Sequence, residues 1–193
     1  MKISSAEFIK AAVDQRGWPK EGIPQVAFVG RSNVGKSSLI NNLVQRRGLV
    51  KTSGTPGKTR EINFFLINKL FYFVDLPGFG FARVPDKMQD NWAGMIEDYL
   101  SGCPDLKLVA FLIDIRHEPG KIDLIMHQWL TQNQVTAIYV VTKADKIAKG
   151  ARQKHLSVIA KAFGISPNSL LMYSSETGEG KGPLWDFIQA AVS

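Results

Sequence analysis

Residues 25–37 read QVAFVGRSNVGKS, a short apolar run that leads into a glycine-rich loop. The run is rich in β-forming residues and ends at a glycine, which is typical of a buried strand. After the loop, Leu39, Ile40 and Leu43 recur at helical spacing. The segment therefore predicts a strand, a loop and a helix, in that order.

The loop of this segment fits the phosphate-binding pattern GxxxxGK[ST], in the strand and helix context that the pattern requires. Glycines let the backbone N–H groups and the helix N-terminus face a phosphate, and Lys36 adds a positive charge toward the β- and γ-phosphates. Ser37 would place its hydroxyl on Mg²⁺. The predicted phosphate-binding residues are Gly30, Arg31, Ser32, Asn33, Val34, Gly35, Lys36, Ser37 and Ser38.

A second motif, DLPG, follows the apolar run that ends at Asp75. Asp75 can hold Mg²⁺ through a water molecule, and the N–H of Gly78 can meet a γ-phosphate. Leu76 and Pro77 complete this predicted nucleotide-binding loop. Lys36 and Gly78 are therefore predicted to take part in catalysis.

The motif TKAD, at residues 142–145, follows another apolar run and indicates which base is read. A carboxylate at Asp145 can accept both the ring N–H and the exocyclic amine of guanine, a donor pair that adenine lacks. The stem of Lys143 would lie over the base, and a backbone N–H near Ser174 could bond the guanine carbonyl. The predicted base-binding residues are Thr142, Lys143, Ala144, Asp145, Tyr173, Ser174 and Ser175.

Strand-like and helix-like patterns alternate along the rest of the chain. Strands are predicted at residues 25–30, 62–67, 70–75, 108–114, 135–142 and 169–174, and helices at residues 36–43, 87–100, 122–130, 151–163 and 182–192. Continuous apolar strands flanked by helices indicate a parallel sheet that is covered on both faces. We predict an α/β fold, a Ras-like P-loop domain with a six-stranded, mostly parallel sheet and one antiparallel strand.

Residues 1–24 are predicted to be an N-terminal extension that packs on a domain formed by residues 25–193. Phe8, Ile9, Ala12 and Val13 recur at helical spacing within it. The apolar runs of the chain are far shorter than the ~20 residues of a membrane-spanning helix. The N-terminus lacks the pattern of a signal peptide, so a cytoplasmic location is expected.

The net charge of +7 suggests an anionic partner. Residues 46–60 hold five basic side chains and no acid, and residues 143–161 hold six basic side chains and only Asp145 as an acid. Both clusters suit RNA phosphates, but a solvated charged face explains them equally well. Cys103 is the only cysteine and is expected to be a small buried residue. His117, His127 and His155 show no metal-ligand spacing.

The strings GRSNVGKSSLIN, TSGTPGKTREINFF, DLPGFGFARVP, DIRH and TKAD resemble those of the EngB family, also called YihA or YsxC. This family belongs to the translation-factor-related GTPases with a Ras-like domain, and the similarity runs from about residue 25 to the C-terminus. It implies binding and hydrolysis of GTP with Mg²⁺, a role in assembly of the large ribosomal subunit, and a need for the protein in normal septation. The expected partner is the precursor of that subunit, with its rRNA and proteins, and the expected state is a monomer that binds neither DNA nor membrane.

The resemblance also implies that Thr59 is a switch threonine that binds Mg²⁺ when GTP is present and takes part in catalysis. Thr59 directly precedes a predicted strand, which would let a short hinge move its hydroxyl, although Thr55 is an alternative ligand. The neighbouring residues expected at the nucleotide are Gly57, Lys58, Arg60 and Glu61.

Three positions depart from the pattern of Ras-like enzymes. Phe79 stands where a glutamine orients the attacking water, so intrinsic turnover should be slow. In related GTPases, an asparagine at the position of Asn33 is associated with a bound K⁺. Asn33 could have that role here, or it could only shape the phosphate loop. Thr142 replaces an asparagine that would brace the base-binding loop to the phosphate loop, so guanine selectivity should depend mainly on Asp145.

Three other functions fit parts of the sequence. A non-enzymatic RNA-binding module would use the basic clusters and keep a vestigial nucleotide site, but Lys36, Ser37 and Asp75 are intact. A P-loop kinase or ATPase is disfavoured by Asp145. A direct regulator of cell division would share the nucleotide chemistry and differ only in its partner.

Overall fold

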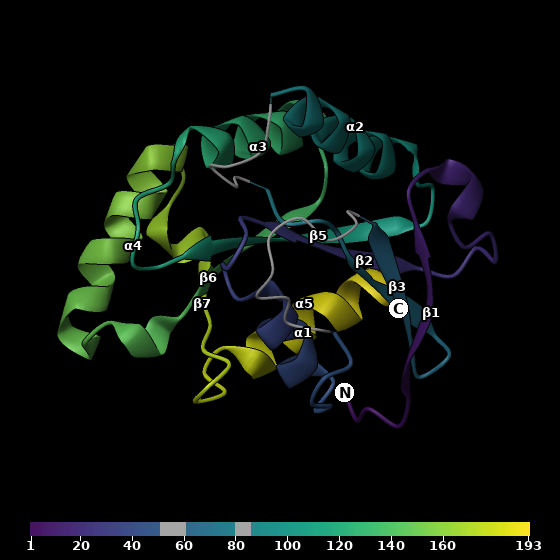
Figure 1. Cartoon of the computed structure of the whole chain (residues 1–193). Coiled ribbons are helices and arrows are strands. Elements are labelled where there is room, and N and C mark those ends of the chain that lie inside the picture. The colour runs from purple at the N-terminus through teal and green to yellow at the C-terminus, as the bar shows by residue number, and fades with distance from the viewer. Residues whose placement is uncertain (51–60, 80–85) are drawn as a thin grey trace.

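A seven-stranded sheet with helices on both faces forms the frame of the protein (Figure 1). The computed structural model describes residues 1–50, 61–79 and 86–193, without the side chains of residues 86–93. The strands are β1 (Ala6–Ala12), β2 (Gln25–Gly30), β3 (Ile62–Ile67), β4 (Phe71–Asp75), β5 (Leu106–Asp114), β6 (Ala137–Thr142) and β7 (Leu170–Met172). Their spatial order is β1-β3-β4-β2-β5-β6-β7.

Only strand β3 runs against the others within the described residues, because it pairs antiparallel with both β1 and β4. The remaining neighbours are parallel. The predicted α/β class and mostly parallel sheet are therefore confirmed, but the sheet has seven strands where the sequence predicted six.

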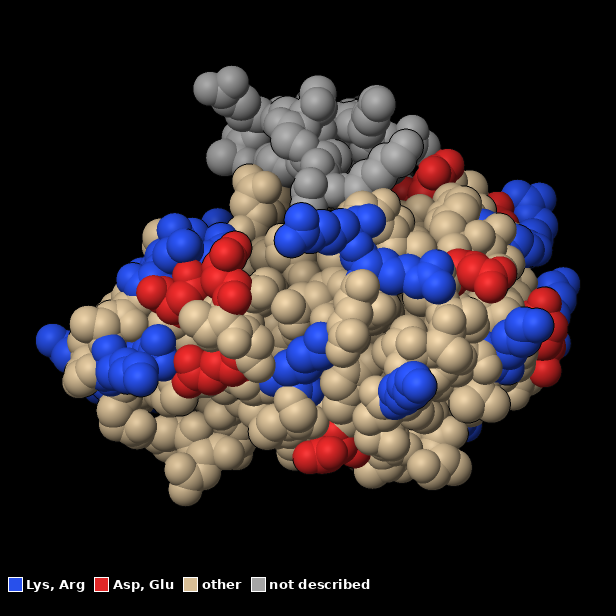
Figure 2. Space-filling view, turned by 90° about the horizontal axis from the view of Figure 1, so that it is seen from below, with Lys and Arg blue, Asp and Glu red and all other residues tan. Residues whose placement is uncertain are grey.

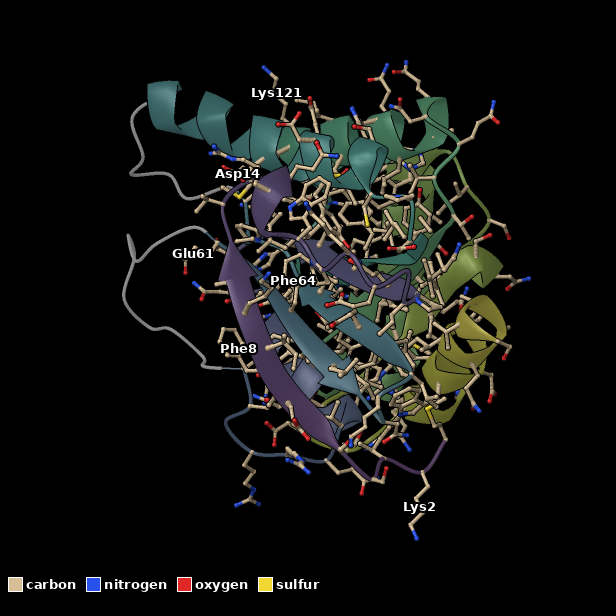
Figure 3. The ribbon with its side chains drawn as sticks, turned by 90° about the vertical axis from the view of Figure 1, so that its right-hand side faces the viewer. Lys2, Phe8, Asp14, Glu61, Phe64 and Lys121 are labelled. Carbon is tan, nitrogen blue, oxygen red and sulfur yellow. The ribbon has the colours of Figure 1, made fainter. Side chains whose placement is uncertain are left out.

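The additional strand is β1, which lies in the segment whose apolar residues recur at helical spacing. This segment pairs with β3 from Ala6 opposite Ile67 to Ala12 opposite Ile62. Figure 3 shows it along the edge of the sheet, where the side chain of Phe8 is 53% exposed. The apolar spacing was misleading because an edge strand leaves apolar side chains partly in solvent instead of burying one helical stripe.

The helices form two layers that bury the two faces of the sheet. They are α1 (Lys36–Leu43), α2 (Asp86–Gly102), α3 (Lys121–Gln132), α4 (Lys149–Phe163) and α5 (Lys181–Val192). Helices α1 and α5 share a core with Val26 and Phe28, and α2, α3 and α4 share the other with Ala27 and Val29. Alternate residues of β2 thus face opposite cores, as expected for a central strand. None of the described helices combines the length and apolarity needed to cross a membrane.

Parallel pairing brings the carboxyl ends of the central strands to one edge of the sheet. Gly30 lies opposite Leu112, and Asp114 lies opposite Thr142. Asp75 ends strand β4 on the other side of β2. Ligands of open α/β sheets bind at such an edge, where the loops after the strands meet.

Candidate functional site

The loop between β2 and α1 has the backbone shape of a phosphate cradle. Asn33 has φ 63° and Gly35, the residue before the helix, has φ 102°. Left-handed conformations of this kind turn successive N–H groups toward one point, and a residue with a Cβ atom would be strained at Gly35. Lys36, Ser37 and Ser38 form the first turn of α1, where helix N–H groups favour an anion.

The DLPG loop packs directly against this cradle. The N–H of Ser32 donates to the carbonyl of Phe79 at 2.9 Å, and the N–H of Phe79 donates to the carbonyl of Gly30 at 3.2 Å. The hydroxyl of Ser32 donates to the carbonyl of Gly78 at 3.3 Å. The two loops predicted to meet the phosphates are therefore held together by their own backbones.

Phe79 is a core residue. Its side chain is 5% exposed and lies beside Phe111, with ring centroids 6.4 Å apart. The ring is apolar and turned inward, so it cannot orient a water molecule for attack. The slow turnover expected from the missing glutamine stays a prediction.

Lys36 and Asp75 form a nearly buried ion pair at the base of the cradle. Their side chains are 10% and 11% exposed. A carboxylate and the hydroxyl of the adjacent Ser37 are hard oxygen donors of the kind that Mg²⁺ prefers, so the residues present fit this ion. The side chains of Val34, Leu76 and Ala144 are buried in the core, so only their backbone groups can face a ligand.

Part of the predicted switch segment cannot be compared with the structure. Thr59 lies outside the described residues, as do Gly57, Lys58, Arg60 and the alternative ligand Thr55. Glu61 is half-buried, and its carbonyl accepts a hydrogen bond from the side chain of Asn63 at 3.4 Å.

At the base-binding end, Asp145 is oriented by its neighbours. The hydroxyl of Ser174 donates to Asp145 Oδ1 at 2.7 Å, and Lys146 Nζ lies 3.0 Å from Oδ2. The Ser174 hydrogen bond, together with that of Lys146, holds the pKa of Asp145 below its ordinary value despite partial burial. The carboxylate is therefore ionised at neutral pH and can accept two hydrogen bonds from one ligand edge.

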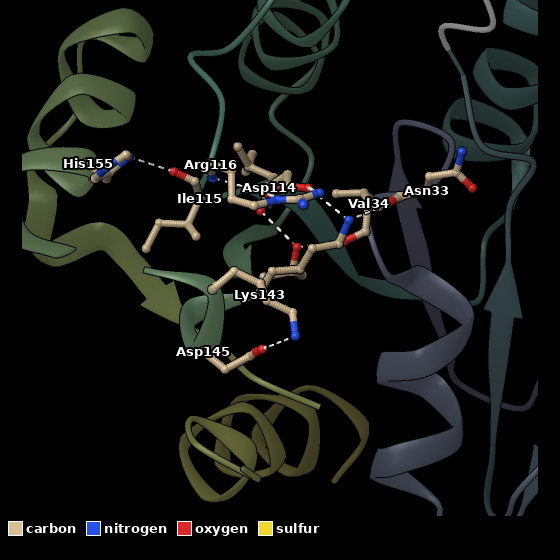
Figure 4. Close-up of polar contacts among 11 residues, drawn as sticks. Asn33, Val34, Asp114, Ile115, Arg116, Lys143, Asp145 and His155 are labelled. Atoms are coloured by element: carbon tan, nitrogen blue, oxygen red, sulfur yellow. Dashed lines mark hydrogen bonds and ion pairs between the residues drawn. The ribbon is translucent and has the colours of Figure 1, made fainter. Parts of the chain in front are cut away.

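Thr142 and Lys143 join the two ends of the site. The hydroxyl of Thr142 donates to the carbonyl of Val34 at 2.6 Å. Lys143 adopts φ 60°, and its ammonium group donates to the carbonyl of Asn33 at 2.6 Å (Figure 4). The amide brace is absent, as the sequence indicated, but the threonine hydroxyl supplies a brace to the same loop.

The sequence analysis did not identify Asp114 as part of this site. Asp114 Oδ2 lies 2.8 Å from Lys143 Nζ, and both of its oxygens accept hydrogen bonds from Arg116. Burial alone would raise the pKa of Asp114, but the bonds from Arg116 and Lys143 outweigh it and hold the pKa well below its usual range. The position of DIR at the end of a strand was the signal that could have revealed this role.

The backbone N–H groups of the three residues that follow β7 differ in whether they are free to bind a ligand. The N–H of Tyr173 donates to Val141 at 2.8 Å, and the N–H of Ser174 donates to Glu179 at 3.0 Å. Within the described residues, the N–H of Ser175 has no hydrogen-bond acceptor. Of the three N–H groups, that of Ser175 is therefore the one available to a ligand.

A pocket of about 250 Å³ lies beside the phosphate loop, between Arg31, the end of β5 and the start of α3. Asp123 lines it, with Oδ2 accepting the N–H of Gly120 at 2.8 Å and lying 3.8 Å from the guanidinium of Arg31. Burial raises the pKa of Asp123. Arg31, Ser32, Asn33 and Val34 of the predicted phosphate loop also line this pocket, whereas Lys36 and Asp145 do not.

Cys103, His127 and His155 are held within the structure. Cys103 is buried, as expected, and burial raises the pKa of its thiol. His127 contacts the hydroxyl of Tyr139 at 2.6 Å, and His155 contacts the carbonyl of Ile115 at 2.9 Å. Among the residues that the structure describes, no group of three or more His, Cys, Asp and Glu side chains could hold a metal ion.

Comparisons with known proteins agree with this geometry. A family model described as 50S ribosome-binding GTPase matches residues 25–143. The probable GTP-binding protein EngB of Geobacter metallireducens is 45% identical over 193 residues, which are 100% of this chain and 95% of the relative. The protein of the same name from Clostridioides difficile is 46% identical over 189 residues, covering 97% of this chain and 93% of that protein.

Solved structures also resemble the chain. The crystal structure of a probable GTP-binding protein EngB superposes with a TM-score of 0.74 at 25% identity, covering 87% of this chain and 98% of that one. Aquifex aeolicus Era bound to GDP and AlF4⁻ gives a TM-score of 0.66 at 22% identity, with 89% of this chain and 57% of that chain covered. The second similarity shows a shared fold alone.

Proposed function

Because the chain belongs to the EngB family of GTP-binding proteins and is a GTPase, we propose that it acts as a nucleotide-dependent switch in assembly of the large ribosomal subunit. Through this role it would support normal cell division and septation. GTP binding and GTP hydrolysis follow from the family, whereas the ribosomal and division roles are the proposal.

The observation that most supports a nucleotide-dependent switch is that hydrogen bonds connect the predicted phosphate-binding loop to the predicted base-binding loop. Lys36 and Asp75 lie at the phosphate end, and Asp145 lies at the base end. Thr142 and Lys143 tie the two through the carbonyls of Val34 and Asn33. Such an arrangement favours a guanine nucleotide lying along the carboxyl edge of the sheet.

In hydrolysis, the chain's own groups mainly position GTP and stabilise negative charge. The N–H groups of the phosphate loop and the ammonium of Lys36 would hold the phosphate oxygens where charge develops. Ser37 and Asp75 would hold Mg²⁺, with Thr59 as a further ligand, and the bound ion neutralises phosphate charge.

We expect slow intrinsic turnover, on the order of 10⁻⁴ to 10⁻² s⁻¹, because the buried Phe79 orients no water. Phosphate release by the purified protein in Mg²⁺ buffer measures this rate, and a rate of several per second would refute the expectation. Repeating the assay in KCl and NaCl tests whether K⁺ takes part near Asn33, and equal rates would leave Asn33 a loop-shaping residue.

The basic cluster at residues 143–161 offers fewer unpaired basic side chains to RNA than the sequence suggested, and residues 51–60 of the other cluster lie outside the described residues. Within residues 143–161, Lys143, Lys146 and Arg152 are engaged in ion pairs with Asp114, Asp145 and Glu179. Lys149, Lys154 and Lys161 are exposed, as are Arg46 and Arg47. Over the face that carries α1 and α5, basic and acidic side chains are interspersed (Figure 2). We therefore propose that RNA contact uses these exposed residues.

Co-sedimentation with large ribosomal subunits tests the switch. We expect the protein to pellet with the subunits in a non-hydrolysable GTP analogue and to remain in the supernatant in GDP. Equal pelleting in both nucleotides would refute the proposed nucleotide-dependent switch. No pelleting in either nucleotide would refute the proposed ribosomal partner.

A further inference from the structure

Three polar contacts converge on Asn42, in the last turn of α1. The side-chain amide of Asn42 donates to the carbonyl of Ser175 at 3.0 Å, and its oxygen accepts the hydroxyl of Tyr173 at 2.7 Å. The backbone carbonyl of Asn42 accepts a hydrogen bond from the ammonium of Lys181. Because the amide nitrogen and oxygen have different partners, the orientation of the side chain is fixed. We call Asn42, Tyr173, Ser175 and Lys181 the Asn42 clamp.

Tyr173 is a rigid anchor for this clamp. Its side chain is fully buried, and burial raises the pKa of its hydroxyl, which therefore stays protonated and donates. Its backbone is fixed on both sides, with its N–H donating to Val141 at 2.8 Å and its carbonyl accepting from Ala144 at 3.1 Å. The contact with Asn42 thus connects α1 to the core of the sheet.

Lys181 adds a second connection, at the start of α5. Its ammonium group donates to the carbonyl of Asn42 at the C-terminal end of α1, a carbonyl that also accepts the N–H of Gln45 at 3.3 Å. A cation at this end of a helix is also favoured by the helix dipole. The clamp therefore holds the end of α1 from two separate elements.

Ser174 and Ser175 divide the recognition of a base between them. Ser174 directs its hydroxyl to Asp145, and its N–H is already bonded to Glu179. The N–H of Ser175 has no acceptor among the described residues. Asp145 can accept from the ring N–H and amine of guanine, which leaves the Ser175 N–H to donate to the guanine carbonyl.

We propose that Asn42 is a positioning residue for guanine recognition, because it holds Ser175 by its carbonyl and thereby aims the Ser175 N–H at the guanine carbonyl. This inference rests on the proposed nucleotide site. Asn42 itself does not touch the base. Helix α1, whose first turn carries the phosphate-binding residues, would then position the loop that reads the base.

Asn41 provides a matched control on the same helical turn. Its side chain bonds the backbone of Val50 in both directions, donating at 2.8 Å and accepting at 2.9 Å. It has the same chemistry and the same helix position to within one residue, but it does not contact the loop of Ser174 and Ser175.

The experiment compares the affinities of GDP, 6-thio-GDP and IDP for the wild type, Asn42→Ala, Asn42→Asp and Asn41→Ala, and ADP is also titrated into the wild type. GDP is the reference, 6-thio-GDP carries a weaker acceptor at the position of the carbonyl oxygen, and IDP lacks the amine that Asp145 accepts. Nucleotide-stripped, full-length protein is titrated with each. The Asp variant keeps the acceptor for Tyr173 but loses the donor to Ser175, so it reports on the same contact if the Ala variant does not fold.

In Asn42→Ala and Asn42→Asp we expect GDP to bind about tenfold more weakly, which corresponds to the loss of about one hydrogen bond. The preference for GDP over 6-thio-GDP should shrink, while the preference for GDP over IDP should persist because Ser174 still orients Asp145. Asn41→Ala should keep both preferences. Unchanged preferences in both Asn42 variants, or the same loss in Asn41→Ala, would overturn the inference. A wild type that does not prefer GDP to ADP would instead overturn the proposed function, and the clamp with it.

Discussion

The hydroxyl of Thr142 connects the predicted base-binding loop, which contains residues 142–145, to the phosphate loop. It donates to the carbonyl of Val34, a residue whose side chain is buried. Thr142→Val removes the donor at nearly constant volume, so we expect a loss of about 1 to 3 kcal/mol in the free energy of unfolding and a weaker affinity for GDP. Urea denaturation and calorimetry measure both. Thr142→Ser keeps the hydroxyl and should retain most of the affinity; equal losses in both variants would argue against the brace.

Gly180 ends the loop after β7 in a conformation that only glycine adopts easily. It has φ 80°, and a Cβ atom built there would lie 1.9 Å from the carbonyl oxygen of Met172. Gly180→Ala should therefore be destabilising by more than about 3 kcal/mol, or prevent folding.

Gly182, two residues further on, is the matched control. A Cβ atom there meets nothing within 4 Å, and the residue lies inside helix α5. Gly182→Ala should be neutral or stabilising by about 0.5 to 1 kcal/mol. Thermal denaturation of Gly180→Ala and Gly182→Ala compares the two effects. Similar melting temperatures for the two variants would contradict the structure of this loop.

Because of Asp114, the free energy of unfolding should decrease as the pH falls into the acid range. Arg116 and Lys143 lower its pKa in the folded state, against the effect of burial, whereas an unfolded Asp has a pKa of about 3.9. The unfolded state then binds more protons, so the stabilisation is fully present above pH 4 and is lost as pH falls toward the folded pKa.

The test compares the wild type with Asp114→Asn between pH 6 and pH 3. The wild type should be the more stable at pH 6, and this advantage should decline with decreasing pH. Asp186→Asn, which changes an exposed acid on α5, serves as the control. An advantage that stays constant over the whole pH range would show that the ion pairs of Asp114 are not formed.

At the scale of elements, hydrogen exchange of the β1 amides tests whether the N-terminal segment forms a strand. Because β1 is an edge strand whose only partner among the described strands is β3, about every second amide of Ala6–Ala12 should be protected from hydrogen exchange. A helix would protect consecutive amides instead. Exchange measured by NMR distinguishes the two, and fast exchange at every position would contradict the pairing.

The elements that the sequence predicted well are those with a local signal. The apolar run before Gly30 and the helical spacing of Leu39, Ile40 and Leu43 specify β2 and α1 without reference to the rest of the chain. Strand β1 has no comparable signal, since only pairing with β3 decides its conformation. Such pairing depends on residues 50 to 61 positions away.

The same distinction applies to the site. Motifs located Lys36, Asp75 and Asp145, because the chemistry of phosphate and guanine requires those groups at those spacings. Asp114 and Asn42 were not found, because their roles come from contacts with segments far away in the sequence. No local pattern records the contacts of Asn42, whereas the position of Asp114 at the end of a strand was a usable signal.

At the scale of the whole molecule, the sheet brings the phosphate loop, the DLPG loop and the base loop to one edge. The registers of β2, β4, β5 and β6 place Gly30, Asp75, Asp114 and Thr142 together there. The braces from Thr142 and Lys143 connect these loops directly. A nucleotide that bridges them should therefore stabilise the entire domain, in proportion to its concentration over its Kd.

The most direct test of this account is calorimetric titration of nucleotide-stripped protein with GDP and with ADP in Mg²⁺ buffer, repeated with xanthosine diphosphate for Asp145→Asn. We predict tight binding of GDP and little heat from ADP for the wild type, and a shift of preference from GDP to xanthosine diphosphate in the variant. No heat from GDP, or an unchanged base preference in Asp145→Asn, would contradict it.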